Sequence, residues 1–126
     1  MSRQAAGGLC AAVAGLALGA AHPGLAAAPA PARLQVVARE HSFALSRGVV
    51  PSGPVVVELA NLGEDDHDLA LRRLGPGAVT RRIVRTTPGA VRALEATLRP
   101  GRYRLWCTLG DHRARGMVAT LTVRRR

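Results

Sequence analysis

Aromatic residues are almost absent from this sequence of 126 residues, which contains one Phe, one Trp and one Tyr. Modules that bind single-stranded nucleic acid stack the bases on several aromatic side chains, so the sequence does not fit that class. Lysine is missing altogether, and all 18 basic residues are arginine. Only two cysteines occur, which allows one disulfide at most.

The rest of the composition is typical of a globular chain. Hydrophobic residues make up 48% of the sequence, too many for a chain that stays unfolded for lack of apolar side chains. The length suits a single domain, because domains commonly contain about 100–150 residues. Eight acidic residues against 18 arginines give a formal net charge of +10. We therefore expect one small and strongly basic domain.

Residues 1–28 follow the order of a secretory signal, in which basic, apolar and small residues succeed one another. Arg3 precedes a run of Ala, Gly, Leu and Val, and Ala26-Ala27-Ala28 offers small side chains to a signal peptidase. A membrane anchor is the alternative, but a spanning helix needs ~20 strongly apolar residues, and this segment is rich in Ala and Gly. We predict export to the periplasm or cell envelope and a domain of residues 29–126.

Removal of this signal leaves Cys107 as the only cysteine, because Cys10 lies within residues 1–28. Exported proteins usually pair their cysteines or lack them. A single thiol in an oxidising compartment is open to oxidation unless something occupies it. Cys107 is therefore the first residue that points to a ligand.

Short segments of β-branched or alternating residues, separated by Gly and Pro, fill the chain after residue 33. Tyr103, Leu105 and Cys107 alternate along one segment, which places them on one face of a strand. Residues 78–87 are ambiguous, and we expect a loop there with at most one helical turn. The pattern predicts an all-β fold, a β-sandwich of about seven to eight strands. The expected strands are residues 34–38, 43–46, 55–60, 69–71, 91–98, 103–107 and 117–123.

A thiol, an imidazole and a thioether occur together in the segment from Cys107 through His112 to Met117, with the spacing C-x4-H-x4-M. Cys107 ends one predicted strand and Met117 begins the next, so the loop between them can bring the three side chains together. Gly110 and Gly116 permit tight bends in this loop. The segment therefore offers three candidate metal ligands.

A fourth ligand has to come from another part of the chain. His67, just before the predicted strand at residues 69–71, is the best candidate, and His41 is the alternative. One thiolate, two imidazoles and a weak thioether form the trigonal site of blue copper. Structural zinc sites favour four strong ligands, and Met is not one of them, so zinc is disfavoured. A binuclear copper site needs a second cysteine in the loop, and multicopper chemistry needs further histidine pairs; the sequence has neither.

Each of these residues has an ordinary explanation when it is considered alone. Cys107 could be an inert core thiol, Met117 a core side chain and His112 a surface histidine. However, Met117 is the only methionine after Met1, and it falls at this spacing from the only cysteine of the expected domain. The combination favours a metal site.

These residues, together with Asn61-Leu62-Gly63 and Pro100-Gly101-Arg102-Tyr103, resemble the cupredoxins, the blue copper proteins of the plastocyanin and azurin type. The resemblance covers roughly residues 34–124. It implies a Greek-key β-sandwich with copper near one end, and His112 as the more exposed ligand and electron port. It also implies one copper ion with the ligands His67, Cys107, His112 and, in the axial position, Met117.

One position departs from the family, in which the residue after the first histidine is often Asn. Here it is Asp68, and we expect its carboxylate to hold Thr108 in the loop that follows Cys107. A negative charge near copper favours Cu(II) and should lower the reduction potential. Trp106 should point away from Cys107, to the opposite face of the strand, and we expect it in the core rather than in an electron relay.

The combined interpretation is an exported one-electron carrier that is not an enzyme. A copper carrier with the same ligands is the alternative, although the sequence lacks the exposed Met or His clusters expected of one. A metal-free structural sandwich is the third possibility.

The basic charge suggests how partners bind. Arg113 and Arg115 flank His112, so we expect them to help dock an acidic redox partner, or an anionic membrane surface. Nucleic acid is not expected as a partner, and the protein should be a monomer. Arg124-Arg125-Arg126 should be a solvated tail. Carboxylates beside His67 give this end of the domain mixed charge: Glu64, Asp65, Asp66 and Asp68.

Overall fold

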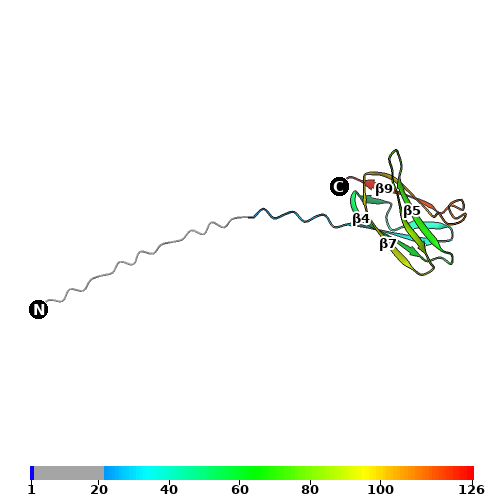
Figure 1. The fold of residues 1–126 in the computed structure, drawn as a ribbon, viewed down its shortest axis with the longest axis horizontal. Coiled ribbons are helices and arrows are strands. Elements are labelled where there is room, and N and C mark those ends of the chain that lie inside the picture. Colours follow the sequence, from blue (N-terminus) through cyan, green and yellow to red (C-terminus); the bar gives the residue numbers. More distant parts are fainter. Residues whose placement is uncertain (2–21) are drawn as a thin grey trace.

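The computed structural model describes Met1 and residues 22–126. Residues 22–31 are exposed, have no secondary structure and lead away from the folded body (Figure 1). The predicted signal falls mainly on residues 2–21, which lie outside the described residues, so export stays a prediction. Within the described residues, no helix is long and apolar enough to cross a membrane.

Nine strands and no helix make up the folded body that the structure describes, residues 32–124. The strands are β1 (Ala32–Arg39), β2 (Ser42–Leu45), β3 (Val49–Pro51), β4 (Gly53–Asn61), β5 (His67–Arg73), β6 (Thr80–Thr86), β7 (Val91–Leu98), β8 (Gly101–Trp106) and β9 (Val118–Arg124).

The strands form two sheets that pack face to face. One sheet has the order β2-β1-β4-β7, and the other has the order β3-β9-β8-β5-β6. Neighbouring strands are antiparallel except for β1 with β4 and β3 with β9, which are parallel. The chain passes repeatedly from one sheet to the other. The predicted Greek-key β-sandwich is therefore confirmed, with one strand more than the upper expectation.

The expectation of a loop at residues 78–87 is wrong, because most of this segment is the edge strand β6. Only Ile83 and Thr86 of β6 are buried. The register between β5 and β6 shifts between His67 and Leu69, so the two buried side chains are three residues apart instead of two. That spacing looks like a helical turn in the sequence.

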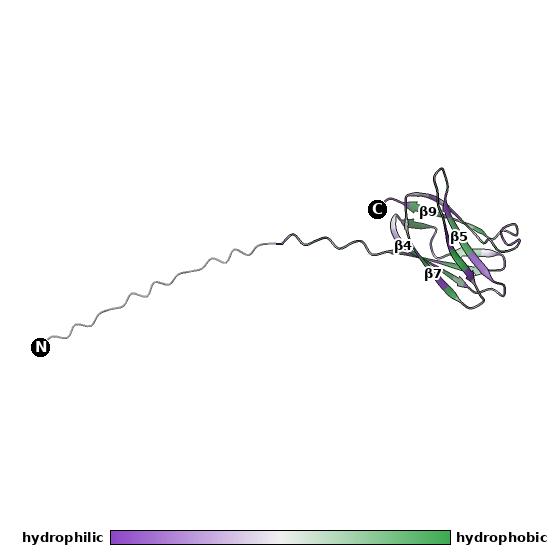
Figure 2. Ribbon diagram, in the orientation of Figure 1, coloured by the Kyte–Doolittle hydropathy of each residue, from purple (hydrophilic) through white to green (hydrophobic). Residues whose placement is uncertain are grey.

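Alternating apolar side chains from both sheets fill the space between them, whereas the outer positions are mostly polar. In Figure 2 the strands of the body accordingly carry both hydrophobic and hydrophilic segments. The hydroxyl of the buried Tyr103 donates a hydrogen bond to the carbonyl oxygen of Arg99 at 2.9 Å, which ties down the turn before β8. The largest fully buried leucines are Leu34, Leu59, Leu69, Leu71, Leu105 and Leu121.

Replacing a core leucine tests this packing. Leu121 is completely buried, and Leu121→Ala should lower the free energy of unfolding by about 2–5 kcal/mol, because the lost methyl groups leave a cavity. The neighbouring Thr120 is exposed, and Thr120→Ala should change the stability by no more than about 0.5 kcal/mol. Urea denaturation measures both variants. Equal effects at the two positions would contradict the assigned faces of β9.

Candidate metal centre

The loop between β8 and β9 holds its ends together by backbone hydrogen bonds. The Cys107 amide donates to the Met117 carbonyl at 3.2 Å, and the Met117 amide donates to the His112 carbonyl at 3.0 Å. Gly110 and Gly116 have φ values of 48° and 101°, in the region that favours glycine. The loop therefore bends at both glycines, as the sequence predicts, and it lies at the end of the body away from the C-terminus (Figure 1).

His67 comes from the other side of the site, at the start of β5. The preceding loop is fixed by the buried side chain of Asn61, whose Nδ2 donates to the carbonyl oxygens of Asp65 at 2.7 Å and Thr86 at 2.9 Å. Its Oδ1 accepts a hydrogen bond from the Gly63 amide at 2.9 Å. These three bonds set where the loop ends and thus where His67 begins β5.

Three candidate ligand atoms converge between these two segments. One ligand atom each from His67, Cys107 and His112 lies within 4.8 Å of the other two. Cys107 Sγ and His112 Nδ1 are 3.6 Å apart. His67 and Cys107 are fully buried, whereas His112 is partly exposed. The group can hold a metal ion that is reached from solvent on the side of His112.

The two ring nitrogens of His67 have different surroundings. Nε2 lies 3.1 Å from Glu40 Oε1, whereas Nδ1 is buried and has no hydrogen-bond partner among the described residues. Leaving a buried polar atom unpaired costs free energy, and a metal ion bound at Nδ1 would remove that cost. The donor set therefore fits a metal on an observation independent of the sequence pattern.

The thiol of Cys107 also fits a metal ligand. Burial raises the pKa of Cys107 above its usual value, so at neutral pH the sulfur carries a proton when nothing else is bound. A bound metal ion would take the place of that proton, because the thiolate is the ligand form.

Met117 and His41 were the other two candidates. Met117 is fully buried, and its backbone bonds place it next to Cys107 and His112, just before β9. His41 lies against His112, with ring centroids 4.8 Å apart, but it is not one of the three converging residues. The position of His41 is thus beside the cluster rather than in it.

Asp68 and Thr108 form the contact that the sequence suggests. The Thr108 amide donates to Asp68 Oδ1 at 2.6 Å, and the Thr108 hydroxyl donates to Asp68 Oδ2. Asp68 is 8% exposed, so these bonds are shielded from water. They join the residue after His67 to the residue after Cys107.

Glu40 is a residue of the site that the sequence does not reveal. Its Oε1 accepts hydrogen bonds from the amides of Glu64 at 2.7 Å and Asp65 at 2.9 Å, as well as contacting His67. The Asp65 amide contributes most to lowering the pKa of Glu40 to about 2, followed by the Glu64 amide and the His67 ring, while desolvation opposes them. The carboxylate is therefore ionised at neutral pH. A Cβ atom at Gly63 would overlap this carboxylate, so a side chain there would displace the end of Glu40.

Three predicted residues lie on the outer side of the site. Trp106 points away from the core, as expected of its strand position, but the prediction that it belongs to the core is wrong. Its ring is half-buried, with the Arg113 guanidinium 4.9 Å from the ring centroid. Arg115 Nε donates to Asp111 Oδ2 at 2.7 Å, so its charge is partly balanced.

Known structures share this fold at low sequence identity. Reduced auracyanin from Roseiflexus castenholzii is 19% identical, with a TM-score of 0.63 over 76% of this chain and 99% of that chain. Auracyanin A from Chloroflexus aurantiacus, described as a "blue" copper protein, is 13% identical, with a TM-score of 0.62 over 75% and 100%. A purple cupredoxin from Nitrosopumilus maritimus is 16% identical, with a TM-score of 0.52 over 71% and 98%. The fold is therefore that of the cupredoxins. No family model and no curated protein matches the sequence.

Glu40→Gln tests whether the carboxylate holds the loop in the metal-free protein. A neutral amide makes weaker hydrogen bonds than a carboxylate, so hydrogen exchange at the Glu64 and Asp65 amides should accelerate by roughly tenfold. Glu95→Gln, at an exposed position of β7, is the matched control. Equal exchange in wild type and Glu40→Gln would show that the carboxylate is not the anchor.

Proposed function

We propose that this chain is a mononuclear copper protein that carries single electrons. The observation that supports this most is the convergence of one thiol and two imidazoles within 4.8 Å at one end of a cupredoxin fold. Soft sulfur suits Cu(I), and imidazole nitrogen suits both oxidation states, so this donor set favours copper. Copper bound there supplies a couple that gains or loses one electron. His67, Cys107 and His112 would hold it, and Met117 would supply a weaker fourth ligand.

The chain keeps these ligands in place by contacts from outside the cluster. Glu40 orients His67, and Asp68 fixes the loop that begins after Cys107. Ligands held in this way move little when the charge at the centre changes, which keeps the barrier to electron transfer low. The geometry thus favours electron transfer over copper delivery, because delivery requires ligands that release the metal ion.

His112 provides the contact with the outside. It is the partly exposed member of the cluster, whereas the other two members have no exposed surface. An electron can enter or leave through its ring without opening the fold. We propose that the protein does this outside the cytoplasm, in the periplasm or cell envelope, on the basis of the signal-like residues 1–28.

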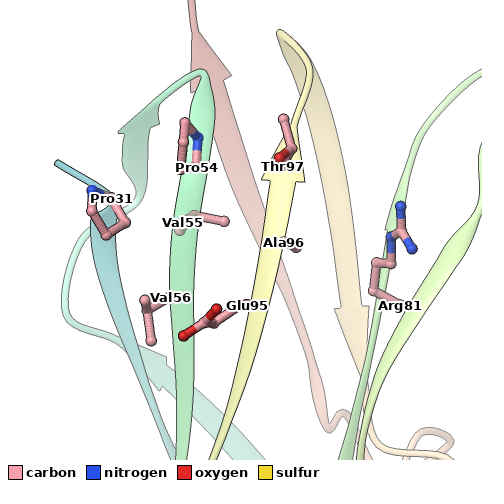
Figure 3. A pocket seen from close by; sticks show the side chains of 8 residues that line it. All are labelled: Pro31, Pro54, Val55, Val56, Arg81, Glu95, Ala96 and Thr97. Carbon is pink, nitrogen blue, oxygen red and sulfur yellow. The ribbon is translucent and has the colours of Figure 1, made fainter. Parts of the chain in front are cut away.

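A carrier is proposed rather than an enzyme, and the position of one large surface groove, away from the cluster, agrees with this. A groove of about 480 Å³ lies along β4 and β7, between Pro54, Val56 and Glu95 on one side and Arg81 of β6 on the other (Figure 3). It is at the Pro54 end of β4, whereas the cluster is near the Asn61 end. A substrate bound in this groove would not reach the metal ligands.

Copper loading tests the proposal. One equivalent of Cu(II) should produce intense visible absorption from the bond to the Cys107 thiolate, together with a reversible one-electron wave in voltammetry. Cys107→Ser should abolish the absorption. His41→Gln is the matched control, because His41 lies beside the cluster, and it should retain the colour. A coloured Cys107→Ser variant, or rapid loss of Cu(I) from the wild type, would contradict an electron carrier at this site.

Asp68→Asn tests the electrostatic role of that carboxylate. The amide oxygen can still accept the Thr108 backbone hydrogen bond, whereas the bond from the Thr108 hydroxyl to Oδ2 is lost, so the variant removes the charge and keeps one of the two bonds. Loss of a negative charge near copper disfavours Cu(II), so the reduction potential should rise. Asp66→Asn removes the same charge from a more exposed position that is paired with Arg85, and it should produce a smaller rise. An unchanged potential in Asp68→Asn would refute this role.

A further inference from the structure

The arginines are concentrated on one of the two sheets. The strands of the five-stranded sheet contain eight arginines and one acidic residue, Asp68. The strands of the four-stranded sheet contain three arginines and two glutamates. The single acid of the five-stranded sheet is engaged with Thr108. The basic charge of the strands is therefore concentrated on the five-stranded sheet and is not spread evenly over the body.

Four of these arginines and one from the loop between β8 and β9 form one outer surface, which we call the arginine face: Arg72, Arg82, Arg102, Arg104 and, in the loop, Arg113. Each of the four strand arginines is next in the chain to a buried residue, so its side chain points to the outer face of the sheet. All five arginines are exposed. None of them forms an ion pair within the part of the chain that the structure describes.

Two arginines of this face stand directly opposite each other. Arg72 on β5 pairs with Arg104 on β8 in the register of the sheet. Like charges at facing positions destabilise a sheet, so this arrangement does not serve the stability of the fold. It does create a strong local attraction for negative charge.

The arginine face is hollowed along β5 and β8, from the turn after β5 to Arg113 in the loop that carries His112. A depression of about 290 Å³ is lined by Arg72, Arg104 and Arg113 around Trp106, with Arg73, Leu74 and Gly75 completing it. Trp106 precedes Cys107 in the chain, and Arg113 follows His112. Two residues that line this depression are therefore chain neighbours of cluster residues.

We propose that the arginine face docks an acidic redox protein, whose carboxylates bind the guanidinium groups around Trp106. This inference rests on the proposed electron-transfer function. In the docked pair, copper held at the site would exchange one electron with the redox centre of the partner, so that one of the two is oxidised as the other is reduced. No proton or further reactant is needed.

The other side of the site repels such a partner. Glu40, Glu64, Asp65 and Asp111 lie around His67 and His41, and Arg115 is already paired with Asp111. An acidic surface that approached from that side would meet like charge. The mixed charge at this end of the body therefore steers an acidic partner to the arginine face.

A protein suits this face better than a lipid surface. Guanidinium groups bind carboxylates through two parallel hydrogen bonds, and a depression accepts a side chain that projects from a partner. A tryptophan that anchors a protein to a membrane places its free ring in the interface. The ring of Trp106 is instead half-buried under Arg113.

The test uses the copper-loaded protein and a gold electrode coated with a carboxylate-terminated monolayer. Arg72→Gln/Arg104→Gln should bind this surface about tenfold more weakly than the wild type, with a weaker dependence on salt. Arg33→Gln/Arg92→Gln removes the same charge from exposed positions of the other sheet and should bind like the wild type. Because Arg72 and Arg104 face each other, the first variant should also keep or raise its melting temperature.

Equal weakening in the two double variants would overturn the proposal, since net charge alone would then explain binding. Stronger binding to phosphatidylglycerol vesicles than to the carboxylate surface, lost in Arg72→Gln/Arg104→Gln, would replace the protein partner by a lipid. Visible absorption and voltammetry of each sample in free solution monitor the centre itself. Loss of those signals in the wild type would refute the proposed function, whereas normal signals with unselective binding would refute only the docking face.

Discussion

The site depends on the hydrogen bonds between Asp68 and Thr108, because these bonds join the two segments that carry the candidate ligands. The two residues are 40 positions apart in the sequence, at the start of β5 and after the end of β8. β5 and β8 pair only from Ala70 and Trp106 onward, so the sheet ladder itself stops short of the cluster. The buried carboxylate of Asp68 therefore connects β5 to the segment after β8, where the two strands are no longer paired. Glu40 makes a comparable connection from the turn after β1 to the loop before His67.

Burial and surface charge have different roles at this end of the molecule: burial fixes the candidate ligands, and surface charge orients a partner. Two cluster residues, His67 and Cys107, are completely buried, which excludes water and fixes one ring and the sulfur. Acidic residues surround the histidine side, and unpaired arginines cover the neighbouring outer face of the five-stranded sheet. A strongly basic protein thus presents an acidic and a basic surface on either side of the partly exposed ring of His112. Such an arrangement orients a charged partner before contact, which matters more for an electron carrier than for a protein that only stores metal.

Local patterns allowed much of the fold and part of the site to be predicted. Cys107, His112 and Met117 are close in sequence, and the alternation around them identifies the strands on both sides. The contribution of Glu40 could not be predicted, because its contacts are 24 to 27 residues away and depend on the path of the turn after β1. The strand β6 was missed because a register shift removes its alternation. The arginine face could not be predicted either, because it depends on the pairing of β5 with β8, which no single segment of the sequence reveals.

X-ray absorption at the copper edge, in the oxidised and the reduced protein, tests the central claim most directly. The account predicts one sulfur and two imidazole nitrogens bound to copper in both states, with nearly the same distances, because contacts outside the cluster hold these ligands in place. A centre without bound sulfur, or one that exchanges ligands when it is reduced, would contradict it.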